Sequence, residues 1–365
     1  MKVINICGAR PNFMKIAPLM RSMACEPTIE PLLVHTGQHY DRAMSELFFE
    51  QLEIPQPDIN LDVGSGSHAQ QTGLIMQRFE PLLTEVQPDA VLVVGDVNST
   101  IACALVAAKM GVAVFHVEAG LRSFDRTMPE EINRVLTDTI SDLLFVSEPS
   151  GLANLKNEGV AEDKIHFVGN VMIDTLERNR ARAEKSQILE QLGLEPKRYG
   201  VITMHRPAAV DRPDIMRDLL KAFEEIQRDL PLIFPIHPRT RQQLASAGLN
   251  GQLEGLPNLR LIDPQGYLDF LKLMADSAMV LTDSGGIQEE TTILGVPCLT
   301  LRENTERPAT ITHGTNRLVG MDPQRLLEGY RSICAHPCEE HQQPEKWDGR
   351  AAERITRIIA QWQRD

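Results

Sequence analysis

Carboxylates stand at the ends of two apolar runs in the first half of the chain. Asp96 follows the run 90–94, and Glu118 follows the run 112–117. Glu130 opens another acidic group further along. Carboxylates that share a site repel one another, so one of them is driven towards its neutral form. A general base then stands beside a general acid, and the pattern predicts proton-transfer chemistry.

Each of these carboxylates also has a purely structural interpretation. Asp96 is a suitable N-cap for a helix over 98–110. Glu130 and Glu131 suit the first turn of a helix that begins at Pro129, because acidic groups there complement the helix dipole.

Groups that bind anions recur along the chain. Arg10 and Lys15 follow the first apolar run, and His205 and Arg206 follow the run 200–204. A guanidinium recognises phosphate oxygens in a bidentate manner, so these positions predict an anionic ligand. The alternative is a set of solvated cations at ordinary strand-to-helix turns.

A Ser-Gly-Gly sequence at 284–286 follows another apolar run and opens a helix. Backbone N–H groups at such a turn are not covered by side chains, which makes a cradle for phosphate. Glu290 lies further into the same helix, where a carboxylate suits a ribose diol better than a phosphate. The sequence therefore predicts a nucleotide site, with a helix cap and solvated acids as the structural alternative.

The elements that must position these residues alternate between short apolar runs and longer amphipathic stretches. Continuous β-branched runs are typical of parallel strands buried on both faces, and alternation with helices predicts doubly wound α/β domains. We expect about six strands in each half. The runs are 3–7, 31–35, 90–94, 112–117, 143–147, 165–169, 200–204, 232–236, 259–262, 279–282, 298–301 and 317–320.

The chain has 365 residues, which favours about two domains. We expect a Rossmann-like domain over 1–173, a polar helical connection over 174–194 and a second Rossmann-like domain over 195–349. A final helix over 350–365 is expected to return to the first domain. Ligands in such folds bind at the carboxyl ends of the strands, where the chemical groups stand.

Composition excludes several classes of protein. A net charge of −13 and 5% aromatic residues disfavour a nucleic-acid surface. No run reaches the length of a membrane span, the start lacks a signal-peptide cleavage site, and the six cysteines are scattered, so a cytoplasmic protein is expected. Two weaker patterns are discounted: a G-x-G-x-x-A match at 64–69, which follows a poor strand, and the Cys334, His336, Cys338 and His341 spacing. We therefore expect neither a dinucleotide site there nor a metal.

The motifs occur together in a fixed order along essentially the whole chain. They are G-x-R-P-x-x-x-K at the start, T-G-Q-H at 36–39, G-D at 95–96, H-V-E-A-G-L-R at 116–122, P-E-E-x-N-R at 129–134, H-R-P at 205–207, H-P-R-T-R at 237–241, D-S-G-G-I-Q-E-E at 283–290 and T-E-R-P at 305–308. This set resembles the non-hydrolysing UDP-N-acetylglucosamine 2-epimerase family.

The resemblance implies a GT-B-type pair of Rossmann-like domains facing a cleft, usually in a homodimer, with no cofactor. It implies reversible conversion of UDP-GlcNAc to UDP-ManNAc, a supply step for bacterial surface polysaccharides. In that reaction UDP is eliminated to leave a 2-acetamidoglucal, and is then added back. The implied catalytic residues are Asp96, Glu118, Glu130 and His205. The implied substrate-binding residues are Arg10, Lys15, Glu131, Arg134, Arg206, His237, Phe270, Ser284, Gly285, Gly286, Glu290 and Arg307.

The chain departs from the family pattern at two places. Many members carry Glu and Asn shortly after the H-R pair, where this chain has Ala208 and Ala209. Many bacterial members have Arg after the Q-H pair, within a regulatory UDP-GlcNAc site, where this chain has Tyr40. We therefore expect altered substrate activation. Alternative functions are a hydrolysing epimerase that releases ManNAc and UDP, a GT-B glycosyltransferase that uses a UDP-sugar, and a UDP-sugar binding protein without activity.

Overall fold

The computed structural model describes residues 1–37, 42–336 and 341–363. The chain divides into two compact units. Unit 1 comprises Met1–Arg178 and Glu345–Asp365, and unit 2 comprises Asn179–Pro344. Residues 174–194, expected as a connection, hold the end of one helix that crosses the division and a short helix that belongs to unit 2.

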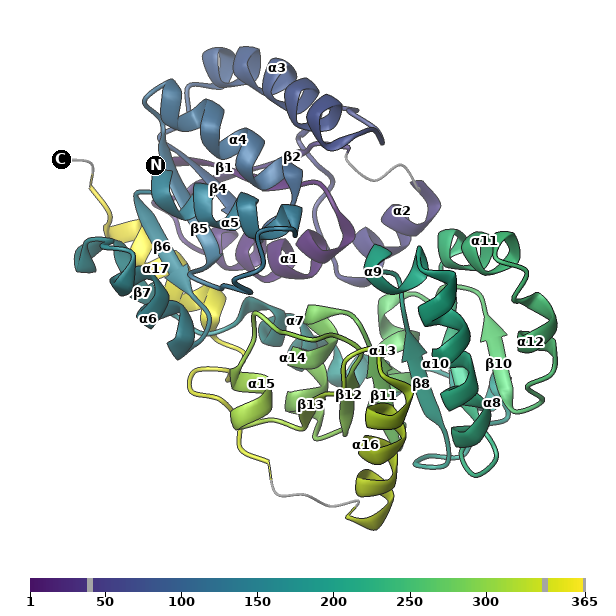
Figure 1. The fold of residues 1–365 in the computed structure, drawn as a ribbon. Helices are drawn as coiled ribbons and strands as arrows, with labels where there is room; N and C mark the ends of the chain where they lie inside the picture. Colours follow the sequence, from purple (N-terminus) through teal and green to yellow (C-terminus); the bar gives the residue numbers. More distant parts are fainter. Residues whose placement is uncertain (38–41, 337–340, 364–365) are drawn as a thin grey trace. The chain divides into compact units, whose positions relative to one another are not determined.

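Unit 1 is built on a parallel sheet of seven strands in the order β3-β2-β1-β4-β5-β6-β7 (Figure 1). Its strands are β1 (Lys2–Cys7), β2 (Glu30–His35), β3 (Ile59–Asn60), β4 (Ala90–Val94), β5 (Ala113–Ala119), β6 (Leu143–Val146) and β7 (Ile165–Phe167). Its helices are α1 (Arg10–Ala24), α2 (Arg42–Gln51), α3 (His68–Val86), α4 (Asn98–Lys109), α5 (Pro129–Ile140), α6 (Pro149–Asn157), the short 3₁₀ helix η1 (Glu162–Lys164), most of α7 (Val171–Ala183) and α17 (Ala351–Gln361).

Burial explains why these strands form. Every residue of β4 and β5 is buried, as expected of parallel strands that helices cover on both faces.

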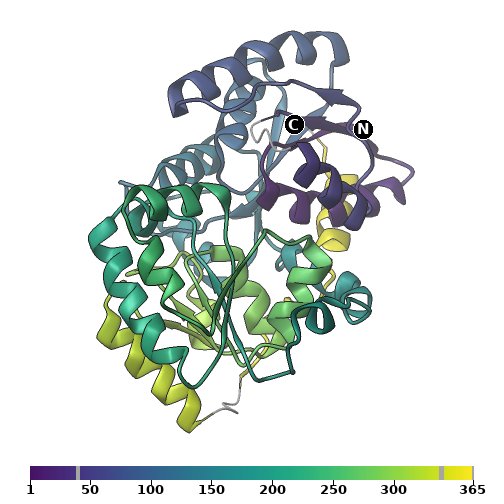
Figure 2. The same cartoon turned by 90° about the vertical axis from the view of Figure 1, so that its right-hand side faces the viewer.

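Helices α3, α4 and α5 lie in a row, and α1 lies beside α17 (Figures 1 and 2). Asp174 of α7 accepts hydrogen bonds from the backbone N–H groups of Ala351 (3.0 Å) and Ala352 (2.7 Å), which caps α17. The C-terminal helix is thereby part of unit 1.

Unit 2 repeats the topology with six parallel strands in the order β10-β9-β8-β11-β12-β13. Its strands are β8 (Gly200–Thr203), β9 (Leu232–Pro235), β10 (Leu259–Ile262), β11 (Met279–Thr282), β12 (Cys298–Thr300) and β13 (Asn316–Leu318). Its helices are the end of α7, α8 (Ile188–Leu192), α9 (Pro207–Val210), α10 (Pro213–Ile226), α11 (Pro238–Ser246), α12 (Asn250–Glu254), α13 (Tyr267–Ala275), α14 (Gly285–Leu294), α15 (Ala309–Thr312) and α16 (Pro323–Ala335). On α10, residues spaced three or four apart, from Met216 to Ile226, form a buried face against the core.

Each predicted apolar run overlaps a strand, and the α/β prediction is confirmed. One count was wrong, because unit 1 has a seventh strand. This strand, β3, has only two residues, lies at the sheet edge and is partly exposed, so it carries almost no apolar signal. Across the described residues, no helix is long and apolar enough to cross a membrane.

Candidate active site

Strand order reverses once in each sheet, between β1 and β4 in unit 1 and between β8 and β11 in unit 2. Ligands of open α/β sheets bind at the carboxyl ends of the strands at such a switch point. In unit 1 this place is surrounded by Lys15 of α1, Asp96 in the loop after β4, and Glu118 of β5. In unit 2, His205 follows β8 and Ser284 follows β11. The two switch points are therefore the candidate sites, and each is described within its own unit.

Glu118 forms a buried ion pair with Lys15 of α1. Its backbone has φ of +74°, a conformation that residues other than glycine adopt rarely and at a cost. The cause is local, because the pairing of β5 with β6 shifts register between Val117 and Ala119. The shift extends β5 beyond the predicted run. Glu118 is therefore the second-last residue of β5 rather than the first residue after it.

Gly95 explains how Lys15 reaches this position. A Cβ atom on Gly95 would lie 3.0 Å from Lys15 Nζ, and Gly95 has φ of +67°. A side chain at residue 95 would therefore compete with the ammonium group for the same space. The bare backbone of Gly95, directly before Asp96, leaves room for the Lys15–Glu118 pair next to the end of β4.

Asp96 is bound to α5. It directly precedes Val97, the N-cap residue of α4, whose side chain makes no capping hydrogen bond. Asp96 Oδ2 accepts hydrogen bonds from the Arg134 guanidinium of α5, with Nε at 3.2 Å and Nη2 closer. Asn133 Nδ2 donates to the Asp96 carbonyl oxygen at 2.8 Å. Asn133 and Arg134 thus hold Asp96 against α5.

Glu131, predicted to bind substrate, makes internal contacts. Its Oε2 accepts from Arg134 Nη1 at 2.5 Å and from the backbone N–H of Ser123 at 2.9 Å. Its Oε1 accepts from the N–H of Phe124 at 2.8 Å. These bonds fix the loop that follows β5, so we assign Glu131 to the support of that loop.

Glu130, the residue before Glu131, is half-buried in the first turn of α5. It has no hydrogen bond or ion pair within the described part of the chain.

Asp283 organises the loop after β8 in unit 2. Its buried Oδ2 accepts from the backbone N–H groups of His205 (2.9 Å) and Arg206 (2.8 Å), and its Oδ1 lies 3.0 Å from His205 Nδ1. Burial raises the pKa of Asp283, but His205 and the two N–H groups lower it further, so the pKa lies below its usual value. The ionised Asp283 orients the imidazole, which is 54% exposed and open to a ligand. Sequence reasoning assigned no role to Asp283, although it directly precedes Ser284.

The N-terminus of α14 is open. Ser284 is the N-cap residue, and its side chain makes no capping hydrogen bond. A Cβ atom on Gly285 would lie 2.4 Å from Arg307 Nη1, so the glycine lets a buried guanidinium lie directly against the first turn. Backbone N–H groups and an arginine therefore meet at one helix end, as an anion site requires.

Arg307 belongs to a cluster that also includes the buried residues Arg302, Glu306 and Glu289 and the partly exposed Arg206. Arg302 Nη2 donates to Glu306 at 2.7 Å, and Arg307 Nε donates to Glu289 at 2.7 Å. Arg206 Nη2 lies 3.9 Å from Glu306 Oε1. Three guanidinium groups face two carboxylates, so the cluster carries excess positive charge beside α14. The protein is acidic overall, yet this place suits a diphosphate.

Glu290 is fully buried, and the hydroxyl of Tyr267 donates to its Oε1 at 2.8 Å. Burial is the main cause that raises the pKa of Glu290, to about 7.

Two further predicted residues of unit 2 lie at the starts of helices. Phe270 lies on α13 with Tyr267 and is half-buried. His237 is the N-cap residue of α11, where its Nδ1 accepts from the N–H of Arg239 at 3.3 Å.

The other residues and motifs named in the sequence analysis lie away from the two switch points or outside the described residues. The side chain of Arg10 and the whole of Tyr40 lie outside the described residues. Ala208 and Ala209 form part of α9, where Ala209 is buried in the core of unit 2. At the discounted G-x-G-x-x-A match, Ser67 caps α3 by accepting from the N–H of Gln70 at 3.3 Å. No three His, Cys, Asp or Glu side chains within the described ranges could hold a metal ion.

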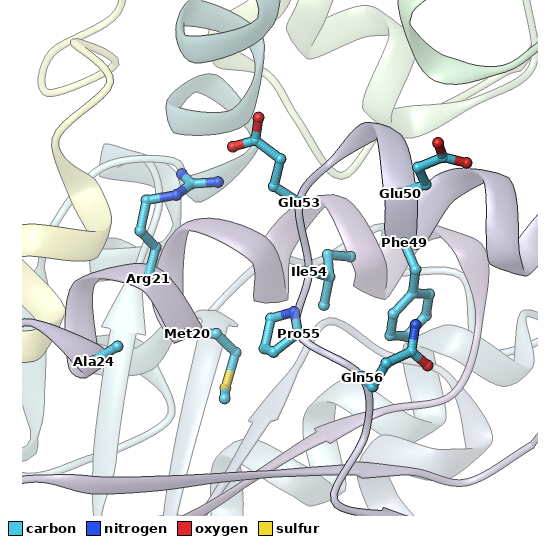
Figure 3. Close-up of a pocket in the computed structure, with 9 residues that line it drawn as sticks. All are labelled: Met20, Arg21, Ala24, Phe49, Glu50, Glu53, Ile54, Pro55 and Gln56. Atoms are coloured by element: carbon cyan, nitrogen blue, oxygen red, sulfur yellow. The ribbon is translucent and has the colours of Figure 1, made fainter.

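A pocket of about 710 Å³ lies apart from the predicted residues (Figure 3). It is lined by α1, the end of α2 and the segment 53–56 of unit 1. Met20, Phe49 and Ile54 form its apolar part, and the carboxylates of Glu50 and Glu53 stand at its rim. Its lining includes none of the predicted site residues, so the pocket adds nothing to the candidate site.

Comparison with known proteins identifies the family of the chain. The family model described as UDP-N-acetylglucosamine 2-epimerase matches residues 21–360. The UDP-N-acetylglucosamine 2-epimerase of Methanocaldococcus jannaschii is 42% identical, over 98% of this chain and 99% of that protein. The UDP-2,3-diacetamido-2,3-dideoxy-D-glucuronate 2-epimerase of Pseudomonas aeruginosa is 40% identical, over 99% of each chain.

A solved structure resembles the chain over its full length. The crystal structure of the M. jannaschii UDP-GlcNAc 2-epimerase in complex with UDP-GlcNAc and UDP has a TM-score of 0.93 and 41% identity, and the match covers 98% of this chain and 99% of that one. The predicted GT-B-type fold, with two Rossmann-like units, is thereby confirmed. Because the family model spans most of the chain and the relatives match nearly all of it, this chain belongs to the UDP-N-acetylglucosamine 2-epimerase family.

Proposed function

We propose that the chain interconverts UDP-GlcNAc and UDP-ManNAc without hydrolysis. A carboxylate removes the proton at C2, the C1–O bond breaks, and UDP leaves with the bonding electron pair. The sugar becomes a 2-acetamidoglucal. UDP oxygen then attacks C1 while a proton is delivered to C2 from the other face, which restores the diphosphate ester with inverted C2.

One observation carries the proposal: two carboxylates, Asp96 and Glu118, end neighbouring strands of unit 1, and each is paired with a buried cation. The buried cations hold the two carboxylates in fixed positions, as a general acid and a general base require. Glu130 has no such partner in the described part of the chain, so it suits the group that returns a proton. Lys15 and Arg134 orient the two ionised groups.

Unit 2 would bind UDP in this reaction. The first turn of α14, from Ser284 to Gly286, would donate its N–H groups to the diphosphate, together with His205 and Arg206. Arg307 would add positive charge there. Glu290 would accept hydrogen bonds from the ribose hydroxyls, while Phe270 would border the uracil.

The reaction products test this proposal. UDP-GlcNAc incubated with the protein and without NAD is expected to yield UDP-ManNAc, followed by ¹H NMR of the anomeric signals. Accumulation of free ManNAc and UDP would identify a hydrolysing epimerase instead. Since the P. aeruginosa relative is named for a diacetamido sugar, a UDP-2,3-diacetamido sugar serves as the comparison substrate. Turnover of that sugar alone would refute UDP-GlcNAc as the substrate.

Glu290 should make stability depend on pH. Its pKa rises from 4.5 to about 7 on folding, so the native state binds more protons than the unfolded state in that window. Stability contributed by this group therefore falls as pH increases from about 4.5 to about 7. A Glu290→Gln variant removes the buried charge and should melt at a higher temperature than the parent at pH 8, with no difference near pH 5. Its UDP affinity should fall.

The matched control for that prediction is Glu224→Gln, in which the removed charge is exposed on α10 of the same unit. Its melting temperature should follow the parent at both pH values. If Glu290→Gln gains no more stability at pH 8 than at pH 5, Glu290 does not carry a buried charge.

A further inference from the structure

Two buried titratable residues of unit 1, His116 and Asp138, have no part in the scheme above. His116 lies on β5 two residues before Glu118 and is 0% exposed; Asp138 lies on α5 and is 2% exposed. Their side chains meet at 2.6 Å, between His116 Nδ1 and Asp138 Oδ1. Burying such groups costs free energy unless they are paired, so their contacts should show what they do.

Both ring nitrogens of His116 lie within hydrogen-bond distance of an oxygen atom. Its Nε2 lies 2.8 Å from the carbonyl oxygen of Gly95, which can only accept, so Nε2 carries a hydrogen. Burial raises the pKa of Asp138, but His116 and Arg122 lower it further, and the pKa lies below its usual value. Asp138 is then an acceptor for His116 Nδ1. Both ring nitrogens of His116 are therefore engaged inside the unit.

Asp138 holds the other side of the same region. Its Oδ2 accepts from the backbone N–H of Gly120 at 3.0 Å and lies 2.7 Å from Arg122 Nη1. Gly120 comes two residues after Glu118, on the far side of the register shift in β5. The backbone of Glu118, with its positive φ, thus lies between two points that this pair fixes. Such a conformation persists only where its surroundings hold it.

The pair also reaches the neighbouring strand end. Gly95, whose carbonyl oxygen binds His116, directly precedes Asp96. One chain of hydrogen bonds therefore runs from the end of β4 through His116 and Asp138 to the end of β5. It connects the backbone segments that present Asp96 and Glu118.

We propose that His116 and Asp138 are a positioning pair that sets Asp96 and Glu118 in register with each other for proton transfer at C2. The pair touches no substrate and acts only through the two carboxylates. The inference rests on the proposed epimerase function. A misplacement near 1 Å at reacting groups lowers a rate by about 10²-fold, so its loss should lower kcat without weakening UDP binding.

The test compares His116→Ala, His116→Gln and Asp138→Asn with the parent chain. In His116→Ala, kcat for UDP-GlcNAc epimerisation should fall by about 10²-fold, while KM and the Kd for UDP change by less than about threefold. The glutamine amide still donates to the Gly95 carbonyl, so His116→Gln should recover part of kcat. Asp138→Asn keeps the shape of the side chain but not its charge, and it should lower kcat by about tenfold or more.

Asp142→Asn is the matched control. Asp142 Oδ2 accepts from the N–H of Val114 at 2.9 Å, a similar bond at the opposite end of β5, so this variant should keep the parental kcat. If folded His116→Ala retains kcat within about threefold, the positioning inference is wrong. If the histidine variants do not fold, Asp138→Asn decides by the same kcat criterion. No turnover by the parent chain would instead refute the proposed function.

Discussion

A Glu118→Gln variant is expected to bind UDP as tightly as the parent chain and to epimerise UDP-GlcNAc about 10²- to 10⁴-fold more slowly, the usual contribution of a positioned acid or base. The substitution keeps the shape of the side chain but removes its charge, and with it the ion pair with Lys15. UDP binding should survive because the groups proposed to hold UDP are in unit 2. Steady-state kinetics and calorimetric titration with UDP measure the two quantities separately.

The control for this variant is Glu162→Gln. Glu162 also pairs with a lysine, Lys156 at 2.5 Å, but both side chains are largely exposed. An exposed pair contributes little, so its loss should change neither kcat nor stability. Parental kcat in Glu118→Gln would remove Glu118 from the catalytic groups. An equal loss in both variants would indicate that the effect does not depend on the site.

Gly285→Ala is expected to weaken UDP binding by about ten- to a hundredfold, because overpacking typically costs about 1–3 kcal/mol. The added Cβ would lie 2.4 Å from Arg307 Nη1 and 3.0 Å from Glu306 Oε1. The guanidinium must then move away from the first turn of α14, and the anion site loses the positive charge of Arg307 beside its N–H groups. The Kd for UDP is the quantity to measure.

Gly251→Ala provides the same substitution in the same unit without the clash. A Cβ atom on Gly251 meets nothing within 4 Å, and the residue lies in helix α12. Alanine is favoured over glycine in a helix by about 1 kcal/mol, so this variant should bind UDP normally and be slightly more stable. Unchanged UDP affinity in Gly285→Ala would mean that the start of α14 is not the diphosphate site.

The fold could be predicted from the sequence because the central strands of both sheets are largely or fully buried. A strand such as β4, Ala-Val-Leu-Val-Val, has one apolar pattern and one explanation, a parallel strand covered on both faces. The short edge strand β3 escaped prediction because edge position and exposure leave no such pattern.

The positions of the chemical groups were predictable, but their partners were not. Asp96 and Glu118 could be placed at strand ends by their position after apolar runs. Nothing in the run of residues shows that Arg134 binds Asp96, or that β5 shifts register at Glu118. Both depend on contacts between residues far apart in sequence.

The same limit explains Glu131, His116 and Asp138. The resemblance implies that Glu131 binds substrate, and only the structure shows that its carboxylate accepts a hydrogen bond from the N–H of Ser123 in the loop after β5. The contact between His116 and Asp138 could not be predicted either, because the two residues are 22 positions apart in the sequence and meet only in the folded unit.

The deuterium content of the product tests the central claim most directly. In D2O, without added NAD, elimination and re-addition require the proton at C2 to come from solvent, so UDP-ManNAc should carry deuterium at C2, and recovered UDP-GlcNAc should acquire it as well. Mass spectrometry and ¹H NMR of the H2 signal measure this in one incubation. UDP-ManNAc that forms with its original hydrogen at C2 would contradict proton abstraction by the carboxylates of unit 1.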